Sequence, residues 1–371
     1  MRKAVGVVGV AVATAGLLMG SLSAQAAVYQ TSTIDTFAGT GEQVFSGDGG
    51  PAVEAGINQP RDTDVMPDGS VVITDTFNDR IRRVSPDGII TTIAGNGSQE
   101  YNGDGIPATE ASLAWPHDVA VDPKSGNVYI ADAQHHRIRV VTPDGIISTF
   151  AGTGEIGSSG DDGPAVEATL KYPKSVAVRG NALITAGLDN KVRSINFDTR
   201  IISTLVGTGE AGFSGDGGPS RAAQLNGPQR LAVDSQRNVY IADTKNCAIR
   251  RFDTETGTVS TVAGVGGECG YDGDGGPGQQ AKLSHPRGLA LDGDDRLYIA
   301  DSDNARIRML NLSKNVIRTI GGGGQTGYAG EGVVVDQALF YQPRGLTITA
   351  SGDLLVADTF NSRVRIVRSE W

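Results

Sequence analysis

The sequence predicts an all-β fold, a six-bladed β-propeller built from four-stranded antiparallel blades. Two observations predict it: a block of about 57 residues is repeated six times after Ile34, and each copy reads as short strands joined by turns. A proline opens the innermost strand of every copy, and these blade-opening prolines are Pro60, Pro116, Pro173, Pro228, Pro286 and Pro343. Repeats of this length are typical of supersecondary units that stack on their neighbours.

The copy that begins at Pro286 shows the individual elements. Runs rich in branched aliphatic residues occupy 288–292, 297–301, 306–310 and 316–320, and Gly, Asp and Asn residues separate them. Because no apolar stripe of helical period competes, we expect a four-stranded antiparallel meander. Such units arranged about an axis shield one another's edges, as in a propeller.

The second and third strands carry a recognisable string. Residues 297–308 read Leu-Tyr-Ile-Ala-Asp-Ser-x-Asn-x-Arg-Ile-Arg, and the string recurs with drift at 71–82, 128–139, 239–250 and 354–365. It resembles the NHL repeat. Glycine-rich insertions such as 207–219 are similar to those of bacterial secreted and teneurin-type NHL propellers. The resemblance covers the whole chain after its N-terminal segment and implies architecture more firmly than function.

The two ends of the repeat region complement each other. The last copy supplies only three strands, near 345–350, 354–358 and 363–368, and the segment 33–39 matches the fourth-strand segment 90–95. We expect residues 33–38 to join the last blade and to close the ring, which removes the open edges that promote aggregation.

The first 26 residues predict export. Arg2 and Lys3, an apolar run over 4–20 and the sequence Ala24-Gln25-Ala26 form the three parts of a secretory signal peptide. We expect cleavage after Ala26, a secreted, extracellular chain of residues 27–371 that forms the propeller, and no membrane span; an uncleaved anchor is the alternative.

Charge and cysteine content narrow the partners. The formal net charge is −10, and loss of Arg2 and Lys3 makes it −12 because residues 1–26 contain no acid. An acidic surface repels nucleic acid, so we expect no nucleic-acid partner, and we expect a monomer. Cys247 falls in the turn between the second and third strands of the fourth blade and Cys269 in the connection to the next blade, and both emerge on one face. In an exported chain they predict a disulfide that pins the long loop, with two free thiols as the alternative.

Polar residues at constant positions of the repeat indicate structural roles. An aspartate ends the second strand at Asp75, Asp132, Asp243, Asp301 and Asp358, and an arginine lies in the third strand at Arg82, Arg139, Arg193, Arg250, Arg308 and Arg365. We expect each pair to form a clamp within its blade. The third copy has Ala186 in place of the aspartate and Leu188-Asp-Asn190 at the following turn, which predicts a deformed blade.

The glycine-rich insertions each contain an acid. These acids are Asp48, Asp104, Asp161, Asp216, Asp274 and Glu331. We expect them to build turns with neighbouring short polar side chains. A calcium-binding loop is the alternative, although the later ligands of that pattern are missing.

Variable residues inside this constant frame are the candidate binding site. The residue after each blade-opening proline is predicted to lie at the mouth of the central channel, and the six are Arg61, His117, Lys174, Gln229, Arg287 and Arg344. Four are permanently cationic and His117 can protonate, so the set indicates an anionic ligand group such as a carboxylate or phosphate. We expect the neighbouring Asp62 and Asp118 to pair with two of them, and solvated arginines paired with acids are the alternative.

A second interpretation places a catalytic or metal site on the central axis. Asp64 stands where other copies have alanine or threonine, and with His117 and Asp118 it is a candidate for an acid–base pair or for a calcium or zinc site. No nucleophile elbow or His-Glu-x-x-His motif is present. The sequence therefore favours a recognition module for a small anionic molecule, peptide or glycan, and it identifies no cofactor beyond the candidate calcium or zinc site. The alternative is an axial lyase or metal-assisted, lactonase-like hydrolase.

Overall fold

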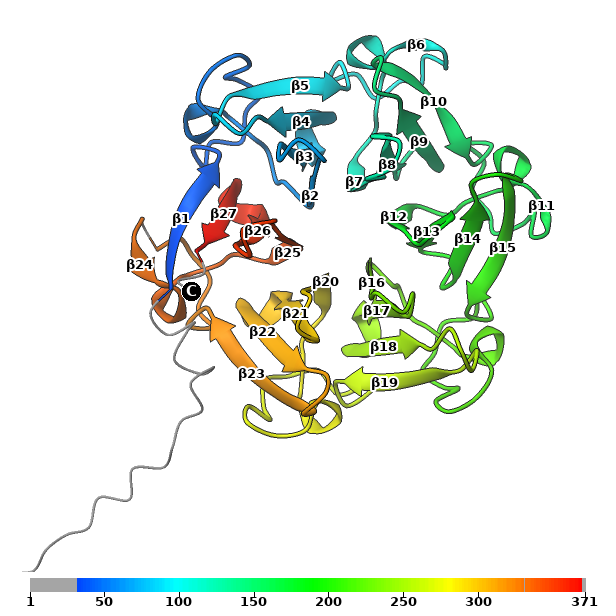
Figure 1. Ribbon diagram of the computed structural model, residues 1–371, viewed down its shortest axis with the longest axis vertical. Helices are drawn as coiled ribbons and strands as arrows, with labels where there is room; N and C mark the ends of the chain where they lie inside the picture. Colours follow the sequence, from blue (N-terminus) through cyan, green and yellow to red (C-terminus); the bar gives the residue numbers. More distant parts are fainter. Residues whose placement is uncertain (1–31, 330, 369–371) are drawn as a thin grey trace, which may run out of the picture.

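Six antiparallel sheets surround a central axis in the computed structural model (Figure 1), which describes residues 32–329 and 331–368. The predicted signal peptide and its cleavage site lie outside the described residues. The ring confirms the all-β, six-bladed propeller. Within the described part of the chain, no helix is long and apolar enough to cross a membrane.

In the first five blades, the four main strands run outward from the axis in sequence order. The first blade contains β2 (Thr63–Val65), β3 (Val71–Asp75), β4 (Arg80–Val84) and β5 (Ile90–Ala94). The second contains β7 (Pro116–Val121), β8 (Val128–Asp132), β9 (Arg137–Val141) and β10 (Ile146–Ala151), with β6 (Ile106–Pro107) outside them. The third contains β12 (Pro173–Val178), β13 (Ala182–Gly187), β14 (Val192–Asn196) and β15 (Ile201–Val206), with β11 (Gly163–Pro164) outside them.

The fourth and fifth blades follow the same order, and in the sixth the two outermost strands precede the three inner ones in the sequence. The fourth contains β16 (Arg230–Val233), β17 (Val239–Asp243), β18 (Ala248–Phe252) and β19 (Val259–Ala263). The fifth contains β20 (Pro286–Leu291), β21 (Arg296–Asp301), β22 (Arg306–Asn311) and β23 (Val316–Gly321). The sixth contains β25 (Pro343–Ile348), β26 (Leu354–Asp358), β27 (Arg363–Val367), β1 (Thr33–Ala38) and β24 (Val333–Val334).

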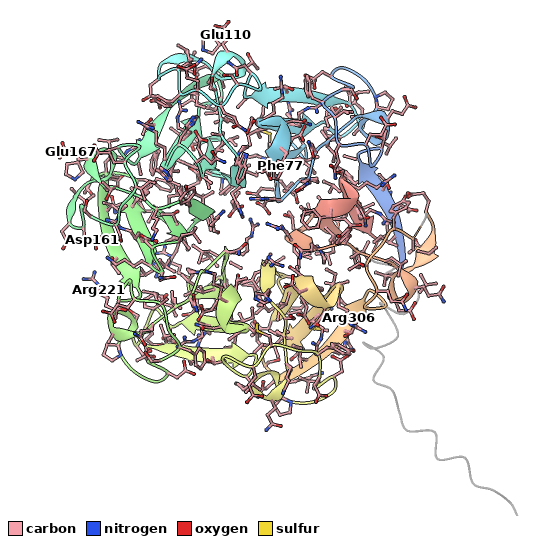
Figure 2. All side chains as sticks on the ribbon, turned by 180° about the vertical axis from the view of Figure 1, so that it is seen from behind. Phe77, Glu110, Asp161, Glu167, Arg221 and Arg306 are labelled. Carbon is pink, nitrogen blue, oxygen red and sulfur yellow. A yellow bond between two sulfur atoms is a disulfide. The ribbon has the colours of Figure 1, made fainter. Side chains whose placement is uncertain are left out.

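Single turns of 3-10 helix interrupt the connections. Six lie in the insertions: η1 (Ala52–Glu54), η3 (Ala108–Glu110), η4 (Ala165–Glu167), η5 (Ser220–Ala222), η7 (Gly278–Gln280) and η9 (Val335–Gln337). Four lie between the second and third strands of a blade: η2 (Thr76–Asn78), η6 (Thr244–Asn246), η8 (Ser302–Asn304) and η10 (Thr359–Asn361). Glu110, Glu167 and Arg221 mark the outer edge of the ring, whereas Phe77 lies near the central opening (Figure 2).

The N-terminal strand and the last strand share one sheet. β1 pairs antiparallel with β27, with Ile34 opposite Val367 and Thr36 opposite Arg365, and β24 lies on the other side of β1. Ile34 is fully buried in the core between the fifth and sixth blades. The outer part of the sixth blade therefore comes from the start of the propeller and its inner part from the end.

Hydrophobic cores fill the spaces between neighbouring blades. Apolar residues of β3 and β8, such as Val72 and Ile130, share one cluster, and those of β17 and β21, such as Tyr240 and Ile299, share another. Because the pleat sends alternate side chains to opposite faces, both faces of each blade are covered. This packing positions the first strand of every blade against the axis.

The predicted clamp is present, and it has an additional acceptor. In the fifth blade, fully buried Arg308 donates to Asp301 at 3.3 Å and to the insertion acid Asp274 at 2.7 Å. The other insertion acids Asp48, Asp104, Asp161 and Asp216 also form ion pairs with the arginine of their own copy. The acids expected only to build turns therefore also attach the insertions to the blades.

Candidate functional site

The six residues after the blade-opening prolines, which we call the rim, surround one narrow cavity on the axis. Its volume is about 10 Å³, space for about one water molecule. The rim residues lie there because each follows the blade-opening proline that leads into the innermost strand of its blade. The structure thus brings together all six residues that the sequence singled out.

The rim cations have few acidic partners. Arg287 lies 2.5 Å from Asp303. No carboxylate of the described residues lies within 4.0 Å of the charged nitrogens of Arg61, Lys174 or Arg344. Arg61 instead has its guanidinium 5.4 Å from the centre of the Phe77 ring. Pairing with nearby acids therefore accounts for Arg287 and not for the other three cations.

Burial changes the charge expected of the rim. Burial, with repulsion from Arg61 and Arg344, lowers the pKa of Lys174 to about 7. Burial and Arg287 lower the pKa of Arg61 to about 10, so Arg61 stays protonated at neutral pH. Burial also lowers the pKa of His117 well below its usual value, and nearby Lys174 adds to the effect. Lys174 is thus not permanently cationic, and His117 is neutral near pH 7.

Below the rim, three charged residues fill the channel. Arg230, at the start of β16, lies 2.5 Å from Asp62 and also pairs with Asp118. Asp62 and Asp118 are almost fully buried. The prediction that these two acids pair with rim cations is wrong, because both carboxylates form ion pairs with Arg230 instead. We call this group of three the plug.

The ion pairs of the plug were not predicted from the sequence, although the sequence contains a signal for them. The second residue after each blade-opening proline is Asp62, Asp118, Ser175, Arg230, Gly288 or Gly345, so acids and a base of opposite charge stand at one phase of the repeat. Residues at one phase of a propeller meet across the axis. The glycine is required at Gly345, since an added Cβ would lie 2.5 Å from Asp62 Oδ1.

Asp64 lies on the other side of the plug. Its two carboxylate oxygens accept the backbone N–H groups of Val65 at 2.8 Å and Val121 at 2.7 Å. Burial raises the pKa of Asp64 to about 6. Asp64 and Arg230 line a cavity of about 480 Å³ with walls of alanine and branched aliphatic side chains.

The three candidate catalytic residues do not form a compact group. Asp118 and His117 line the rim cavity, whereas Asp64 lines the larger one. In the described part of the chain, only Cys247, Cys269 and His285 bring three potential metal-ligating atoms within 4.8 Å of one another. Those two cysteines form a disulfide, so they offer no thiolate.

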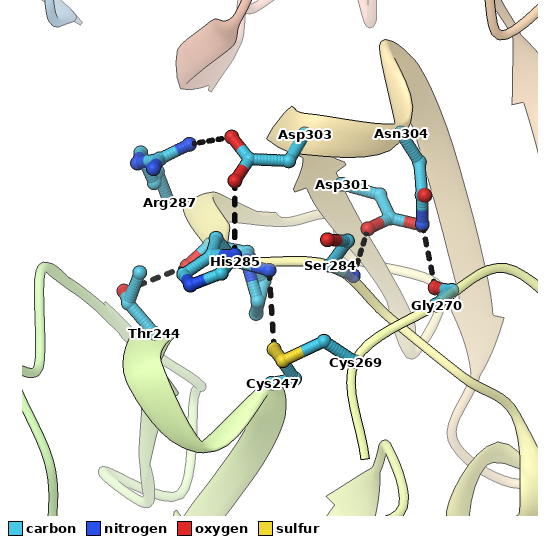
Figure 3. The surroundings of a disulfide bond; sticks show 11 residues. Thr244, Cys247, Cys269, Gly270, Ser284, His285, Arg287, Asp301, Asp303 and Asn304 are labelled. Carbon is cyan, nitrogen blue, oxygen red and sulfur yellow. Dashed lines mark hydrogen bonds and ion pairs between the residues drawn. A yellow bond between two sulfur atoms is a disulfide. The ribbon is translucent and has the colours of Figure 1, made fainter. Parts of the chain in front are cut away.

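The predicted disulfide is confirmed and lies near the rim. Cys247 and Cys269 are bonded, and the backbone N–H of His285 donates to Cys247 Sγ at 3.4 Å (Figure 3). His285 Nδ1 lies 2.9 Å from Asp303, the acid that also holds Arg287. The disulfide therefore anchors the loop that leads into one rim residue.

A family model decides the nature of the repeat. The model described as NHL repeat matches residues 113–141, 225–252, 283–309 and 340–367. The chain contains NHL repeats. It is homologous to teneurin-1 of Gallus gallus, with 28% identity over 303 residues that cover 76% of this chain and 9% of that protein. NHL repeat-containing protein 2 of Homo sapiens is 25% identical over 354 residues, which cover 72% of this chain and 48% of that protein. The chain thus spans less than half the length of these relatives.

Solved structures share the fold at low identity. An auxiliary nutrient binding protein from Bacteroides thetaiotaomicron VPI-5482 has a TM-score of 0.67 and 15% identity, over 91% of this chain and 77% of that one. A streptogramin B lyase has a TM-score of 0.53 and 14% identity, over 92% of this chain and 99% of that one. These likenesses show the propeller architecture of the NHL-repeat chain and leave its function to its own residues.

Proposed function

We propose that this NHL-repeat protein is an exported recognition module that binds a small anionic molecule, peptide or glycan at the rim. The observation that carries the proposal is the packing of Arg61, Lys174 and Arg344 around one cavity without an acid at ion-pair distance among the described residues. Like charges held together in a partly buried site repel one another, and an anion relieves the repulsion.

The geometry limits what enters the rim. Space for about one water molecule admits only the charged terminus of a ligand, such as a carboxylate or a phosphate oxygen. The rest of the ligand lies outside, on the face that carries the glycine-rich insertions. The structural neighbour from Bacteroides thetaiotaomicron VPI-5482 is an auxiliary nutrient binding protein, which supports a binding role, and the disulfide supports an extracellular location.

Contacts of the axial acids favour binding over the alternative lyase or hydrolase. Asp118 is engaged by Arg230 and by the backbone N–H groups of Val119 at 2.8 Å and Val176 at 2.9 Å. Asp64 likewise accepts two backbone N–H groups. A general base or metal ligand needs a carboxylate oxygen that faces the substrate. In Asp64 and Asp118 the carboxylate oxygens instead accept hydrogen bonds from the backbone or from Arg230.

A thermal-shift screen tests the rim. We expect mono- and dicarboxylates, sugar acids or phosphate esters to raise the melting temperature of the wild type, because a ligand that binds only the folded state stabilises it. The double variant Arg61→Gln with Arg344→Gln is expected to lose the shift. Arg221→Gln, at the outer edge of the ring, is the control and should keep it. Equal shifts in the wild type and the rim variant would exclude the rim as the binding site.

Lys174 predicts a pH dependence of anion binding. Its pKa of about 7 means that the ammonium loses its proton as the pH rises through neutrality, and a bound anion favours the protonated form. We expect the affinity for sulfate, whose charge is constant here, to fall about tenfold between pH 6 and pH 8. Titration calorimetry measures it, and the profile of Lys174→Met should be flat. A flat wild-type profile would contradict the role of Lys174.

A further inference from the structure

Five of the six insertions place an aromatic ring against an arginine side chain. The rings are Phe45, Tyr101, Phe213, Tyr271 and Tyr328, and all occupy the same position of the repeat. Where an arginine opens the third strand, its guanidinium carbon lies close to the ring centre: 3.7 Å for Arg80 on Phe45 and 3.8 Å for Arg306 on Tyr271. Distances of this size indicate cation–π stacking.

The third blade lacks both members of this stack. Ser158 occupies the position of the ring, and Lys191 occupies the position of the arginine. The Lys191 side chain also follows the course that the arginine takes in other blades. A Cβ added at Gly209 would lie 3.1 Å from Lys191 Cε, and one added at the equivalent Gly97 would lie 2.5 Å from Arg80 Nη1. The cation is therefore in place, and no described aromatic ring covers it.

A cavity of about 490 Å³, which we call the socket, lies at this point. Its lining includes Ser158 and Lys191, together with Ile156, Lys171, Leu188 and Asp189. Its volume is in the range of small-molecule sites. The socket is at the blade in which Ala186 and the turn 188–190 depart from the repeat, so the sequence departure coincides with an opening in the surface.

The lining determines the chemistry of a ligand. Ile156, which is 60% exposed, and Leu188 offer apolar contacts. Lys171 is exposed, and Lys191 lies 3.8 Å from Asp161, while Ser158 donates to Asp189 at 3.1 Å. Asp189 is a buried carboxylate of the lining, and burial raises its pKa. The lining thus combines apolar side chains with two lysines and one buried carboxylate.

We propose that the socket binds an aromatic ring that carries a negative charge, supplied either by a free aromatic carboxylate or by a tyrosine next to an acid in a peptide. The ring takes the place that Phe45 and its counterparts fill in the other blades, with one face toward Lys191. The acidic group pairs with Lys171. The socket lies apart from the rim, so this proposal is independent of the proposed function.

Two probes and four variants test the socket. Titration calorimetry and saturation-transfer NMR measure 3-phenylpropionate and the blocked dipeptide acetyl-Tyr-Glu-amide against wild-type protein. Ser158→Phe supplies the missing ring from the chain itself, so we expect at least tenfold weaker binding together with an unchanged or higher melting temperature. Lys191→Gln removes the cation and is expected to weaken both probes as well. Thr199→Phe, an exposed position of the same blade, is the matched control and should bind like the wild type.

The fourth variant separates the two sites. Arg61→Gln with Arg344→Gln removes rim cations and should leave both probes bound, which distinguishes the socket from the rim. Tighter binding of the dipeptide than of phenylpropionate identifies a polypeptide as the source of the ring, and the reverse identifies a small aromatic acid. The proposal is overturned if neither probe binds the wild type at about 10 mM, or if Ser158→Phe and Lys191→Gln both bind like the wild type.

Discussion

Removal of residues 28–40 is expected to leave an open ring that aggregates. Of the described residues, this deletion takes away β1, which pairs with β27 on one side and with β24 on the other. It also removes Ile34 and Ala38, which are fully buried in two different inter-blade cores. Loss of these two side chains from their cores, together with exposure of an unpaired strand edge, should lower the free energy of unfolding by more than about 5 kcal/mol.

The measurement compares this deletion with a chain that begins at residue 28. Size-exclusion chromatography with light scattering is expected to show oligomers for the deletion and a monomer for the longer chain. A synthetic peptide of residues 28–40 added during refolding should restore the monomer, because it supplies the missing strand in trans. A monomeric deletion variant with the melting temperature of the longer chain would show that the ring does not depend on β1.

The repeat made the architecture predictable, because constant spacing fixes the phase of each residue. Pro60 and its counterparts placed six side chains on one axis, and the structure brings them to one cavity. The disulfide between Cys247 and Cys269 followed from two repeat positions that emerge on one face. For the rim and the disulfide, the position of each residue in the repeat was sufficient, because these predictions did not require a choice between competing ion-pair partners.

Partner choice and burial were not predictable in the same way. Arg230 pairs with Asp62 and Asp118 across the axis. The shared phase of these residues was visible in the sequence, but the choice of Arg230 over the rim cations as their partner was not. The lowered pKa of Lys174, about 7, arises from burial beside other cations. Ser158 did carry a signal, since five copies have an aromatic residue there, but only the structure shows that the space is open.

Arg308→Ala is expected to destabilise the protein by about 3–5 kcal/mol, the cost of removing one partner of a buried ion pair. Arg308 is fully buried and donates to Asp301, to Asp274 and to the backbone oxygen of Lys282. Without it, the fully buried carboxylate of Asp301 loses its countercharge. The insertion that contains Asp274 also loses its attachment to the blade. Chemical denaturation monitored by circular dichroism measures the change.

Arg306→Ala is the matched control, because Arg306 lies two residues earlier in β22 and is only half-buried. It donates to the backbone oxygens of Asn304 and Gly323 and stacks on Tyr271, so its loss should cost about 1 kcal/mol. The same insertion thus contacts both arginines, but only one of them balances a buried charge. Equal destabilisation by the two substitutions would mean that aromatic stacking, and not the ion pair with Asp301 and Asp274, holds the insertion. A larger effect of Arg308→Ala means that the repeated aspartates and arginines stabilise each blade, and that the rim and the socket are supported by this frame.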